Sequence, residues 1–430
     1  MTISSEVLSL LILAVCIFLF VTKFVPNAVA AVIGCLLFNL TGICSLTEAF
    51  SGFSNSIVLL MFGMMVVGIA MMDTGATVII GKYVAKWSHN NERLFILFAG
   101  IVSAALSTFL SNTAVIAIFL PLIESISRQN PKMNRRVMTL PVTMGAMFGG
   151  VCTLVGSTPQ LTANGILEEM AGVSASMFDY FLPGLVLTAV YLLYAETVGF
   201  WLSKKLWADE KPREYHESED TGKIDASSKD SVSKAKLITV LLIFLFTVVL
   251  FIGAWIPTAT TAVIAAVLCM VTRCTNYKSV VKHMDWSVVF VLAGCLGIAS
   301  GITKGGAGEL MGSFLSGLFG ADTAPLLIFA VFVLLTMVVS NFITNSTAVV
   351  IMLPIALSLC AANGMNPLAF GMGIVYAANL TFSTPLANAQ TAMTLVAGYK
   401  FSDYIKYTWL LDILVYAAIV IVVPLCFPLT

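Results

Sequence analysis

The chain has 430 residues, of which 59% are hydrophobic and 10% are charged, and its mean hydropathy is +0.98. Soluble domains contain roughly 45–50% apolar and about 25% charged residues, so a water-soluble globular protein is excluded. The 22 basic and 22 acidic residues cancel, which leaves no overall basic field for nucleic acid. Many apolar stretches approach the roughly 20 residues that a membrane-crossing helix needs, and we therefore expect a multi-pass membrane protein.

The two halves of the chain repeat the same series of residues. The segment 26–33 (PNAVAAVI) returns 231 positions later as 257–264 (PTATTAVI). A shift of 233 pairs Ser107, Phe109, Asn112 and Pro121 with Ser340, Phe342, Asn345 and Pro354. A shift of 226 pairs Gly145, Leu154, Ser157, Thr158 and Pro159 with Gly371, Leu380, Ser383, Thr384 and Pro385. Self-similarity of this kind indicates repeated structural units, so we expect two copies of one fold.

Each half is predicted to contain three scaffold spans, a hairpin with a polar tip, an interrupted helix and a final span. The first repeat covers 1–203, with scaffold spans in 6–75, the hairpin at 93–127, the interrupted helix at 137–170 and the final span at 178–203. A polar linker covers 204–235. The second repeat covers 236–430, with scaffold spans in 236–303, the hairpin at 325–361, the interrupted helix at 367–398 and the final span at 404–428.

The distribution of charge favours hairpins that re-enter on their own side of the membrane. With re-entrant hairpins, 21 of the 22 Lys and Arg residues fall on one side and only Lys304 lies opposite, as expected when cytoplasmic loops collect basic residues. Each half then crosses five times, and an odd count inverts the second half relative to the first. We expect an all-α polytopic protein of the cytoplasmic (inner) membrane with two inverted repeats, a cytoplasmic linker and both termini external.

Ionisable side chains are costly inside a bilayer and are therefore functional candidates. Glu196 and Asp412 are expected one or two turns inside their spans, where we interpret them as capping or snorkelling groups. His89, His216 and His283 are expected in loops, which argues against a histidine relay or an intramembrane metal site. The sequence thus offers no deep charged group beside the hairpin tips.

Neutral polar residues at depth are the stronger candidates. They occupy the hairpin tips around Asn112 and Asn345 and the breaks at 156–159 and 383–385. A break frees backbone carbonyls that suit Na⁺, and the helix that follows presents N–H groups that suit an anion. Pro159 and Pro385 are predicted to begin these half-helices. The alternative is that the polar residues only join helices, but equivalent positions in both repeats favour binding sites.

These motifs resemble the divalent anion/sodium symporters (INDY-type) of the ion transporter superfamily, which also holds arsenite permeases and NhaD-type antiporters. Ser111-Asn112-Thr113 matches the Ser-Asn-Thr signature of that family, and Gly149-Gly150 with the segment 156–159 is similar to its Gly-Gly and Gly-Thr-Pro segment. The second tip, 344–347 (TNST), and Gln160 depart from the pattern. The resemblance covers nearly the whole chain.

The resemblance implies a set of binding residues. Substrate would be bound by Ser111, Asn112, Thr113, Thr158, Pro159, Asn345, Ser346, Thr347, Thr384 and Pro385. Na⁺ would be bound by Ser107, Ser111, Asn112, Gly156, Ser157, Ser340, Thr344, Asn345 and Ser383. It also implies a homodimer with an elevator-type mechanism, and no cofactor besides the coupling ion.

We therefore expect a secondary active transporter, not an enzyme, that couples Na⁺ to uptake of a small dicarboxylate or other divalent anion. The partners would be that anionic substrate, Na⁺, the lipid bilayer and a second copy of the chain, without nucleic acid. The alternatives are an arsenite permease, a Na⁺/H⁺ antiporter-like or proton-coupled or exchange transporter, and an anion channel.

Overall fold

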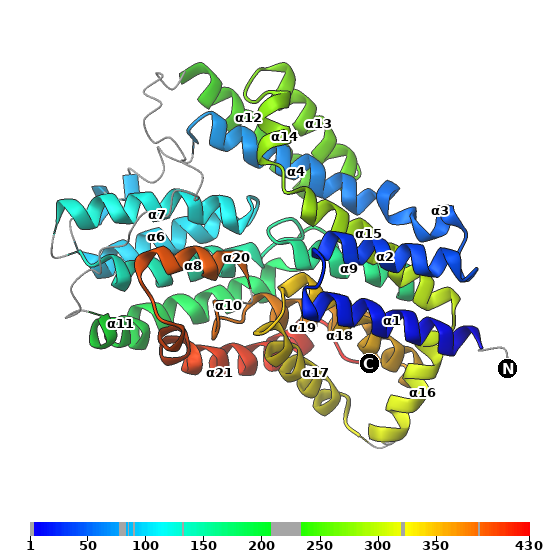
Figure 1. Cartoon of the computed structure of the whole chain (residues 1–430). Coiled ribbons are helices and arrows are strands. Elements are labelled where there is room, and N and C mark those ends of the chain that lie inside the picture. Colours follow the sequence, from blue (N-terminus) through cyan, green and yellow to red (C-terminus); the bar gives the residue numbers. More distant parts are fainter. Residues whose placement is uncertain are drawn as a thin grey trace.

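The computed structural model describes residues 4–76, 83–84, 86–88, 91–130, 133–207, 234–319, 323–385 and 388–430. All regular secondary structure within these ranges is helical (Figure 1). The class expected from the sequence, an all-helical membrane protein, is confirmed. The linker at 208–233 lies outside the described residues.

The first half is a series of helices joined by short connections. They are α1 (Ser5–Thr22), α2 (Asn27–Leu40), α3 (Leu46–Ala49), η1 (Ser51–Ser54), α4 (Ser56–Asp73), α6 (Glu92–Ser107), α7 (Asn112–Gln129), α8 (Arg135–Gly150), α9 (Thr158–Ala171), α10 (Phe181–Tyr194), η2 (Ala195–Gly199) and α11 (Phe200–Trp207). The short helices α3 and η1 were not expected. Helix α11 includes residues 204–207, which were expected in the linker, because the buried Trp207 packs against Tyr399 and Tyr407.

The second half repeats this order. Its helices are α12 (Lys234–Gly253), α13 (Thr258–Val271), α14 (Tyr277–His283), α15 (Trp286–Lys304), α16 (Ala307–Phe319), α17 (Pro325–Ser340), α18 (Asn345–Asn363), α19 (Pro367–Asn379), α20 (Ala389–Met393), η3 (Thr394–Ala397) and α21 (Phe401–Cys426). Helices α14 and α16 lie where loops were expected. Helix α16 packs closely on α18, where a Cβ atom on Gly312 would lie 2.4 Å from the carbonyl oxygen of Ser358.

Helices of one half pack against helices of the other. The second helix of each half contacts the third helix of the opposite half: α2 packs on α15, and α13 packs on α4. Glycines allow both close approaches, because a Cβ on Gly63 would lie 2.6 Å from the Ala262 backbone and one on Gly294 would lie 2.6 Å from Ala31 Cβ. Gly63 and Gly294 correspond in the repeat, so the same packing occurs twice.

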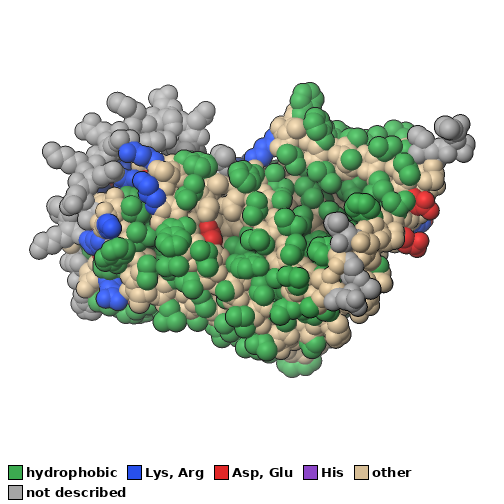
Figure 2. Space-filling view, turned by 90° about the horizontal axis from the view of Figure 1, so that it is seen from below, with side chains coloured by type: hydrophobic (Ala, Val, Ile, Leu, Met, Phe, Trp, Pro, Cys, Tyr) green, Lys and Arg blue, Asp and Glu red, His purple; other side chains and the backbone are tan. Residues whose placement is uncertain are grey.

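The surface has the polarity of a membrane protein. Within the described residues, seven helices are long and apolar enough to span a bilayer, and those at the periphery, such as α1, α12 and α21, are mostly exposed. Figure 2 shows a broad apolar surface with basic side chains mainly at one end and acidic side chains at the other. Lys304 pairs with Glu48, and this contact lowers the pKa of Glu48 to about 2. The assignment of either end to the cytoplasm stays a prediction.

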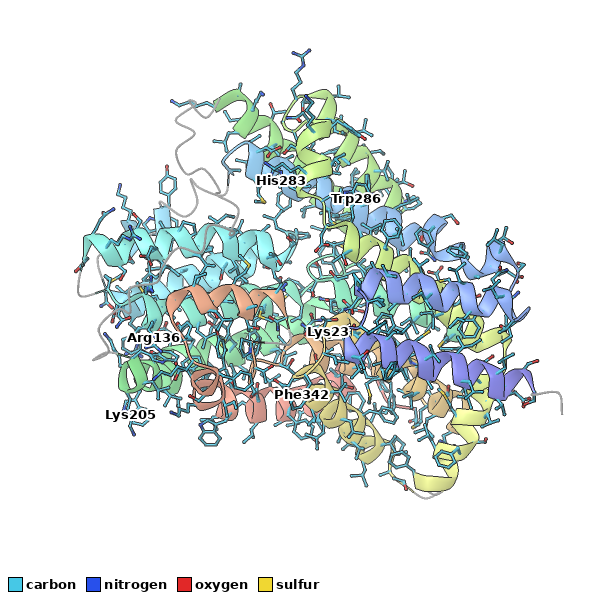
Figure 3. The ribbon with its side chains drawn as sticks, in the orientation of Figure 1. Lys23, Arg136, Lys205, His283, Trp286 and Phe342 are labelled. Atoms are coloured by element: carbon cyan, nitrogen blue, oxygen red, sulfur yellow. The ribbon has the colours of Figure 1, made fainter. Side chains whose placement is uncertain are left out.

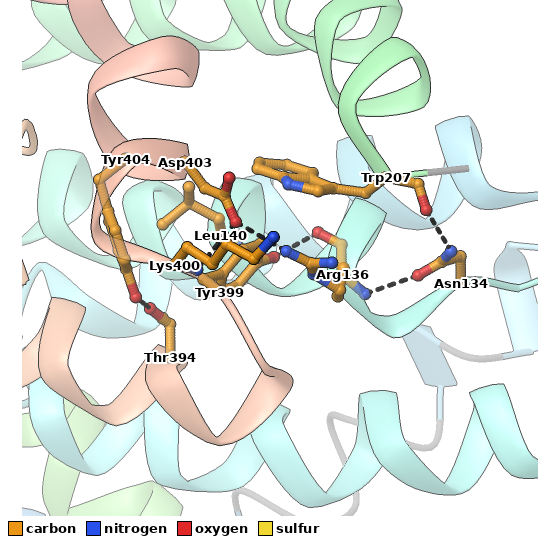
Figure 4. Close-up of polar contacts among 9 residues, drawn as sticks. All are labelled: Asn134, Arg136, Leu140, Trp207, Thr394, Tyr399, Lys400, Asp403 and Tyr404. Atoms are coloured by element: carbon orange, nitrogen blue, oxygen red, sulfur yellow. Dashed lines mark hydrogen bonds and ion pairs between the residues drawn. The ribbon is translucent and has the colours of Figure 1, made fainter. Parts of the chain in front are cut away.

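A buried ion pair joins the start of α8 to the start of α21 (Figure 4). Arg136 Nη2 lies 2.7 Å from Asp403 Oδ2, and both side chains are about nine-tenths buried. The Arg136 guanidinium also stacks over the rings of Trp207 and Tyr399, while the Tyr399 hydroxyl donates to the Arg136 carbonyl. The pair therefore ties the interrupted helix of the first half to the last helix of the second.

We expect Asp403→Asn to lower the free energy of unfolding by about 3 kcal/mol, because removing one partner leaves a buried guanidinium without its counter-charge. The matched control is Arg128→Ala, which breaks the exposed pair with Glu124 and should cost less than about 1 kcal/mol. Thermal unfolding of the detergent-solubilised protein measures both. Equal shifts in the two variants would contradict this role for Asp403.

Candidate functional site

The first hairpin tip is held by one short hydrogen bond and one glycine. Ser107 Oγ, at the end of α6, donates to Asn112 Oδ1, at the start of α7, over 2.5 Å. Asn112 is only 5% exposed, and its amide lies directly against α8, where a Cβ on Gly150 would lie 2.1 Å from Asn112 Oδ1. Asn112 thus occupies the space that any other residue at position 150 would fill.

The second hairpin tip repeats this bond at the equivalent residues. Ser340 Oγ donates to Asn345 Oδ1 over 3.2 Å and also to the carbonyl of Ala378 over 2.8 Å. The hydroxyls of Thr344 and Thr347 lie 2.7 Å apart, and the Asn27 amide of α2 donates to each of them over 3.4 Å. The second tip is therefore also held by a residue from the scaffold spans.

Gln160 bridges the break between α8 and α9 with its side-chain amide. Its amide donates to the carbonyl of Gly150 over 2.8 Å and accepts from Asn379 Nδ2 over 3.2 Å. Ser157 Oγ donates to Asn379 Oδ1 over 2.7 Å. Helix α9 begins at Thr158 with Pro159 next, in agreement with the predicted start. The interrupted helices of the two halves are thus bonded to each other at their breaks.

The second break differs from the prediction. The following helix begins at Ala389 rather than at Pro385, because the Asn388 side chain accepts from the backbone N–H of Thr391 and caps a short helix. Thr384 donates its hydroxyl to the Asn341 carbonyl at the second tip. Ser383 turns away from the tip and donates to Asp412 on α21. Asp412 therefore does not cap or snorkel; it lies eleven residues inside its helix.

A cavity of about 560 Å³ lies between the two tips. The predicted site residues on its wall are Ser111, Asn112, Thr113, Gly156, Ser157, Thr158, Pro159, Thr344, Asn345 and Ser346. The helix N-termini that open into it include those of α7, α9 and α18. Because unpaired N–H groups at a helix N-terminus carry partial positive charge, the wall is suited to an anion.

Other predicted site residues do not reach the cavity wall. Ser107 and Ser340 are fully buried behind the tips, where they hold Asn112 and Asn345. Thr347 is 1% exposed and bonds Thr344 and Asn27. The remaining predicted residues outside the wall are Ser383, Thr384 and Pro385. Thr347, Thr384 and Pro385 therefore do not line the cavity in this arrangement.

The wall opposite the tips is mainly apolar. It consists of α4 and the start of α15, and its apolar members include Met61, Met64, Met65 and Met72. His283 is the last residue of α14 and also lines the cavity, so the expectation that it lies in a loop is wrong; Figure 3 places it beside Trp286. His89 and His216 lie outside the described residues. None of the described lining residues is Lys or Arg, but Asp285, the N-cap residue of α15, places a carboxylate on the wall that was not expected near the tips.

Sequence reasoning missed several polar groups of the site. Asn27, Asn379, Asn388 and Gln390 line the cavity, and Gln390 donates to the hydroxyl of Thr113 over 3.2 Å. Asn379 could have been noticed as an amide in an otherwise apolar stretch, because a buried amide needs partners. Glu196, expected to cap or snorkel, instead pairs with Arg93 at 3.2 Å.

Helices broken by polar residues around a central cavity in a membrane protein define a membrane transporter. The chain belongs to the citrate transporter family, because the model of that family (CitMHS, citrate transporter) matches residues 17–345 and 321–429. It is therefore a transporter and not an enzyme.

Characterised and uncharacterised transporters are among its relatives. The transporter YfbS of Escherichia coli K12, described as uncharacterized, is 21% identical over 97% of this chain and 98% of its own length. The sodium-dependent dicarboxylate transporter SdcS of Staphylococcus saprophyticus is 21% identical over 88% of this chain and 78% of its own length. An uncharacterized transporter of Synechocystis is 29% identical over 44% of this chain, and the match spans only 30% of that protein.

Two solved structures share the fold. The YdaH transporter of Alcanivorax borkumensis superposes with a TM-score of 0.66 at 12% identity, over 97% of each chain. MtrF of Neisseria gonorrhoeae superposes with a TM-score of 0.65 at 13% identity, over 100% of this chain and 96% of its own. At these identities the likeness shows the fold alone.

We expect Gly150→Ala to destabilise the protein by about 1–3 kcal/mol, since the added methyl group and Asn112 would compete for one space. Thermal unfolding in detergent, followed by tryptophan fluorescence, measures the effect. Gly68→Ala is the control, because its Cβ would lie 3.9 Å from the nearest atom, Leu110 Cδ2, although Gly68 lines the same cavity. The close packing of Asn112 on α8 would be refuted by an equally stable Gly150→Ala.

Proposed function

We propose that the protein couples Na⁺ to the uptake of a small dicarboxylate across the cytoplasmic membrane. The observation that carries this proposal is the convergence of the N-termini of α7, α9 and α18 on a polar cavity whose described lining has no Lys or Arg and a single carboxylate, that of Asp285. N-terminal N–H groups attract carboxylates without a fixed cationic side chain. The relative SdcS is named a sodium-dependent dicarboxylate transporter, which agrees in both substrate class and ion.

Sodium has a physical role in such a cavity. A dianion that enters a site with few fixed charges needs nearby cations to offset its own charge. The first ion would lie beside Asn112 and the break at Gly156 and Ser157, where carbonyl and hydroxyl oxygens gather. The second would lie beside Thr344 and Asn345. Bound Na⁺ would therefore complete the substrate site, so that binding of the anion depends on binding of Na⁺.

The two kinds of cavity wall support an elevator-type movement. The tips and breaks supply most of the polar groups, with Asn27, His283, Asp285 and Ser287 on the scaffold side, whereas α4 supplies an apolar face with four methionines. An apolar face forms few directional bonds, so it resists sliding less than a polar one. We propose that the hairpins and interrupted helices move against the scaffold spans within a homodimer, with the linker in the cytoplasm and both termini outside.

Citrate is the second candidate substrate, because the family model is described as a citrate transporter. A cavity of about 560 Å³ has room for either anion. Competition for Na⁺-driven uptake of labelled succinate by unlabelled citrate, sulfate and phosphate in proteoliposomes separates these possibilities. Accumulation against a gradient, driven by Na⁺, also separates the proposed symporter from a channel or an exchanger.

We expect Asn112→Ala and Asn345→Ala each to reduce Na⁺-driven succinate uptake by roughly 10- to 100-fold. Loss of an amide that helps to hold a charged ligand costs about 1.5–3 kcal/mol. Uptake into proteoliposomes is the measurement.

Asn363→Ala is the matched control, since this amide bonds Ser316 outside the cavity and should leave uptake unchanged. The site assignment fails if both tip variants keep wild-type Na⁺-dependent uptake while they remain folded.

A further inference from the structure

One face of α4 lines the substrate cavity with apolar side chains. The residues of this methionine face are Met61, Met64, Met65, Gly68, Ile69 and Met72. Their spacing of three and four residues places them on one side of the helix. From Met61 to Met72 the face extends for about 16 Å along the helix axis. None of its side chains can donate a hydrogen bond, so the methionine face offers a ligand apolar contact.

There is space beside the methionine face. If Gly68 carried a Cβ atom, its nearest neighbour would be Leu110 Cδ2, at 3.9 Å. The cavity volume of about 560 Å³ falls within the roughly 300–1,000 Å³ that is typical of pockets for drug-sized ligands. A four-carbon dicarboxylate would fill only part of such a cavity. The cavity therefore has room for a substrate with a longer chain.

The groups that suit carboxylates lie opposite this face, at the tips and the first break. The N-termini of α7 and α9 belong to the first half of the chain, and the N-terminus of α18 belongs to the second. Asp285 supplies the single carboxylate of the described lining, and it would repel a third negative charge on a substrate. Two carboxylates bound near the two tips would leave the chain between them beside the methionine face.

We propose that the methionine face selects the chain of the substrate, and that the preferred substrate is an unsubstituted dicarboxylate longer than succinate, such as adipate. The inference rests on the proposed function and adds that one carboxylate binds near each tip. Each methylene group buried against apolar side chains raises affinity by up to about fourfold. A hydroxyl group on the chain would lose its hydrogen bonds to water without gaining a partner on this face. Methionine side chains are flexible, so the face can adapt to chains of different length.

Competition in proteoliposomes tests this preference with the wild-type protein. Unlabelled succinate, glutarate and adipate are compared as inhibitors of Na⁺-driven uptake of labelled succinate. We expect the half-inhibitory concentration to fall by roughly two- to fourfold with each added methylene group. A half-inhibitory concentration that stays level or rises from succinate to adipate would refute the inference.

Two matched pairs of anions test the selection against polar chains. Malate is succinate with an added hydroxyl group, and citrate is glutarate with an added hydroxyl and a third carboxylate. We expect malate and citrate to compete at least about threefold more weakly than their unsubstituted counterparts. Equal or stronger competition by malate and citrate would contradict a role of the apolar face in selection.

Substitutions in α4 test where the selection occurs. Gly68→Val adds an isopropyl group to the open space and should weaken the competition by adipate about tenfold more than that by succinate. Met65→Gln places an amide at a half-buried position of the face and should bring adipate and succinate to roughly equal potency. The matched control is Met311→Gln, at a half-buried methionine of α16 outside the cavity, which should keep the wild-type preference. An unchanged preference for adipate in both α4 variants would refute the assignment to the methionine face.

Thermal unfolding of the detergent-solubilised protein separates this inference from the proposed function. In the presence of Na⁺, adipate should raise Tm more than succinate does at the same concentration. That result without Na⁺-driven uptake of either anion would overturn the proposed function and leave the selectivity of the cavity standing. Na⁺-driven succinate uptake without a preference for adipate in either assay would overturn the selectivity and leave the proposed function standing.

Discussion

Polar groups that the helix breaks place in the apolar interior are costly unless they find a partner within the protein, and most of the contacts at the centre of the structure follow from this constraint. At each hairpin, a serine at the end of the first helix donates to the asparagine that begins the second. At each break, a threonine hydroxyl donates to the carbonyl at the end of the first hairpin helix: Thr153 to Thr108 and Thr384 to Asn341. The tips and breaks are therefore one hydrogen-bonded unit in each half.

The two halves use the same plan but are not equivalent. At the first tip, Phe109 packs edge-on against Phe244 of α12, with ring centroids 5.6 Å apart. Its counterpart at the second tip, Phe342, is 67% exposed. The second tip instead bonds Asn27 of α2. The first tip thus contacts the scaffold by an apolar contact and the second by a polar one, so the two tips would separate from it with different energetic costs.

The sequence predicted the helices and the tips well, because apolar runs, N-terminal caps and repeated motifs are local signals. It did not predict the bond between Gln160 and Asn379, since these residues are 219 positions apart and neither carries a motif. It placed the second half-helix at Pro385, because it gave proline more weight than the cap at Asn388. It also interpreted Asp412 as a capping or snorkelling group, because only the fold brings Ser383 to it. Local patterns thus give the elements, and long-range packing gives the partners.

The glycines of the first break have a mechanical consequence. A Cβ on Gly149 would lie 2.0 Å from the Ala104 carbonyl oxygen, and one on Gly156 would lie 2.3 Å from that of Gly150. With Gly150 against Asn112, none of these positions has room for a side chain where α8 and the first break meet α6 and α7. Densely interlocked helices cannot shear past one another without steric overlap, so any displacement of α8 carries the first hairpin along as a rigid block. The hydrogen bond between Ser107 and Asn112 and the contact of Asn112 with Gly150 would then be preserved in any such displacement.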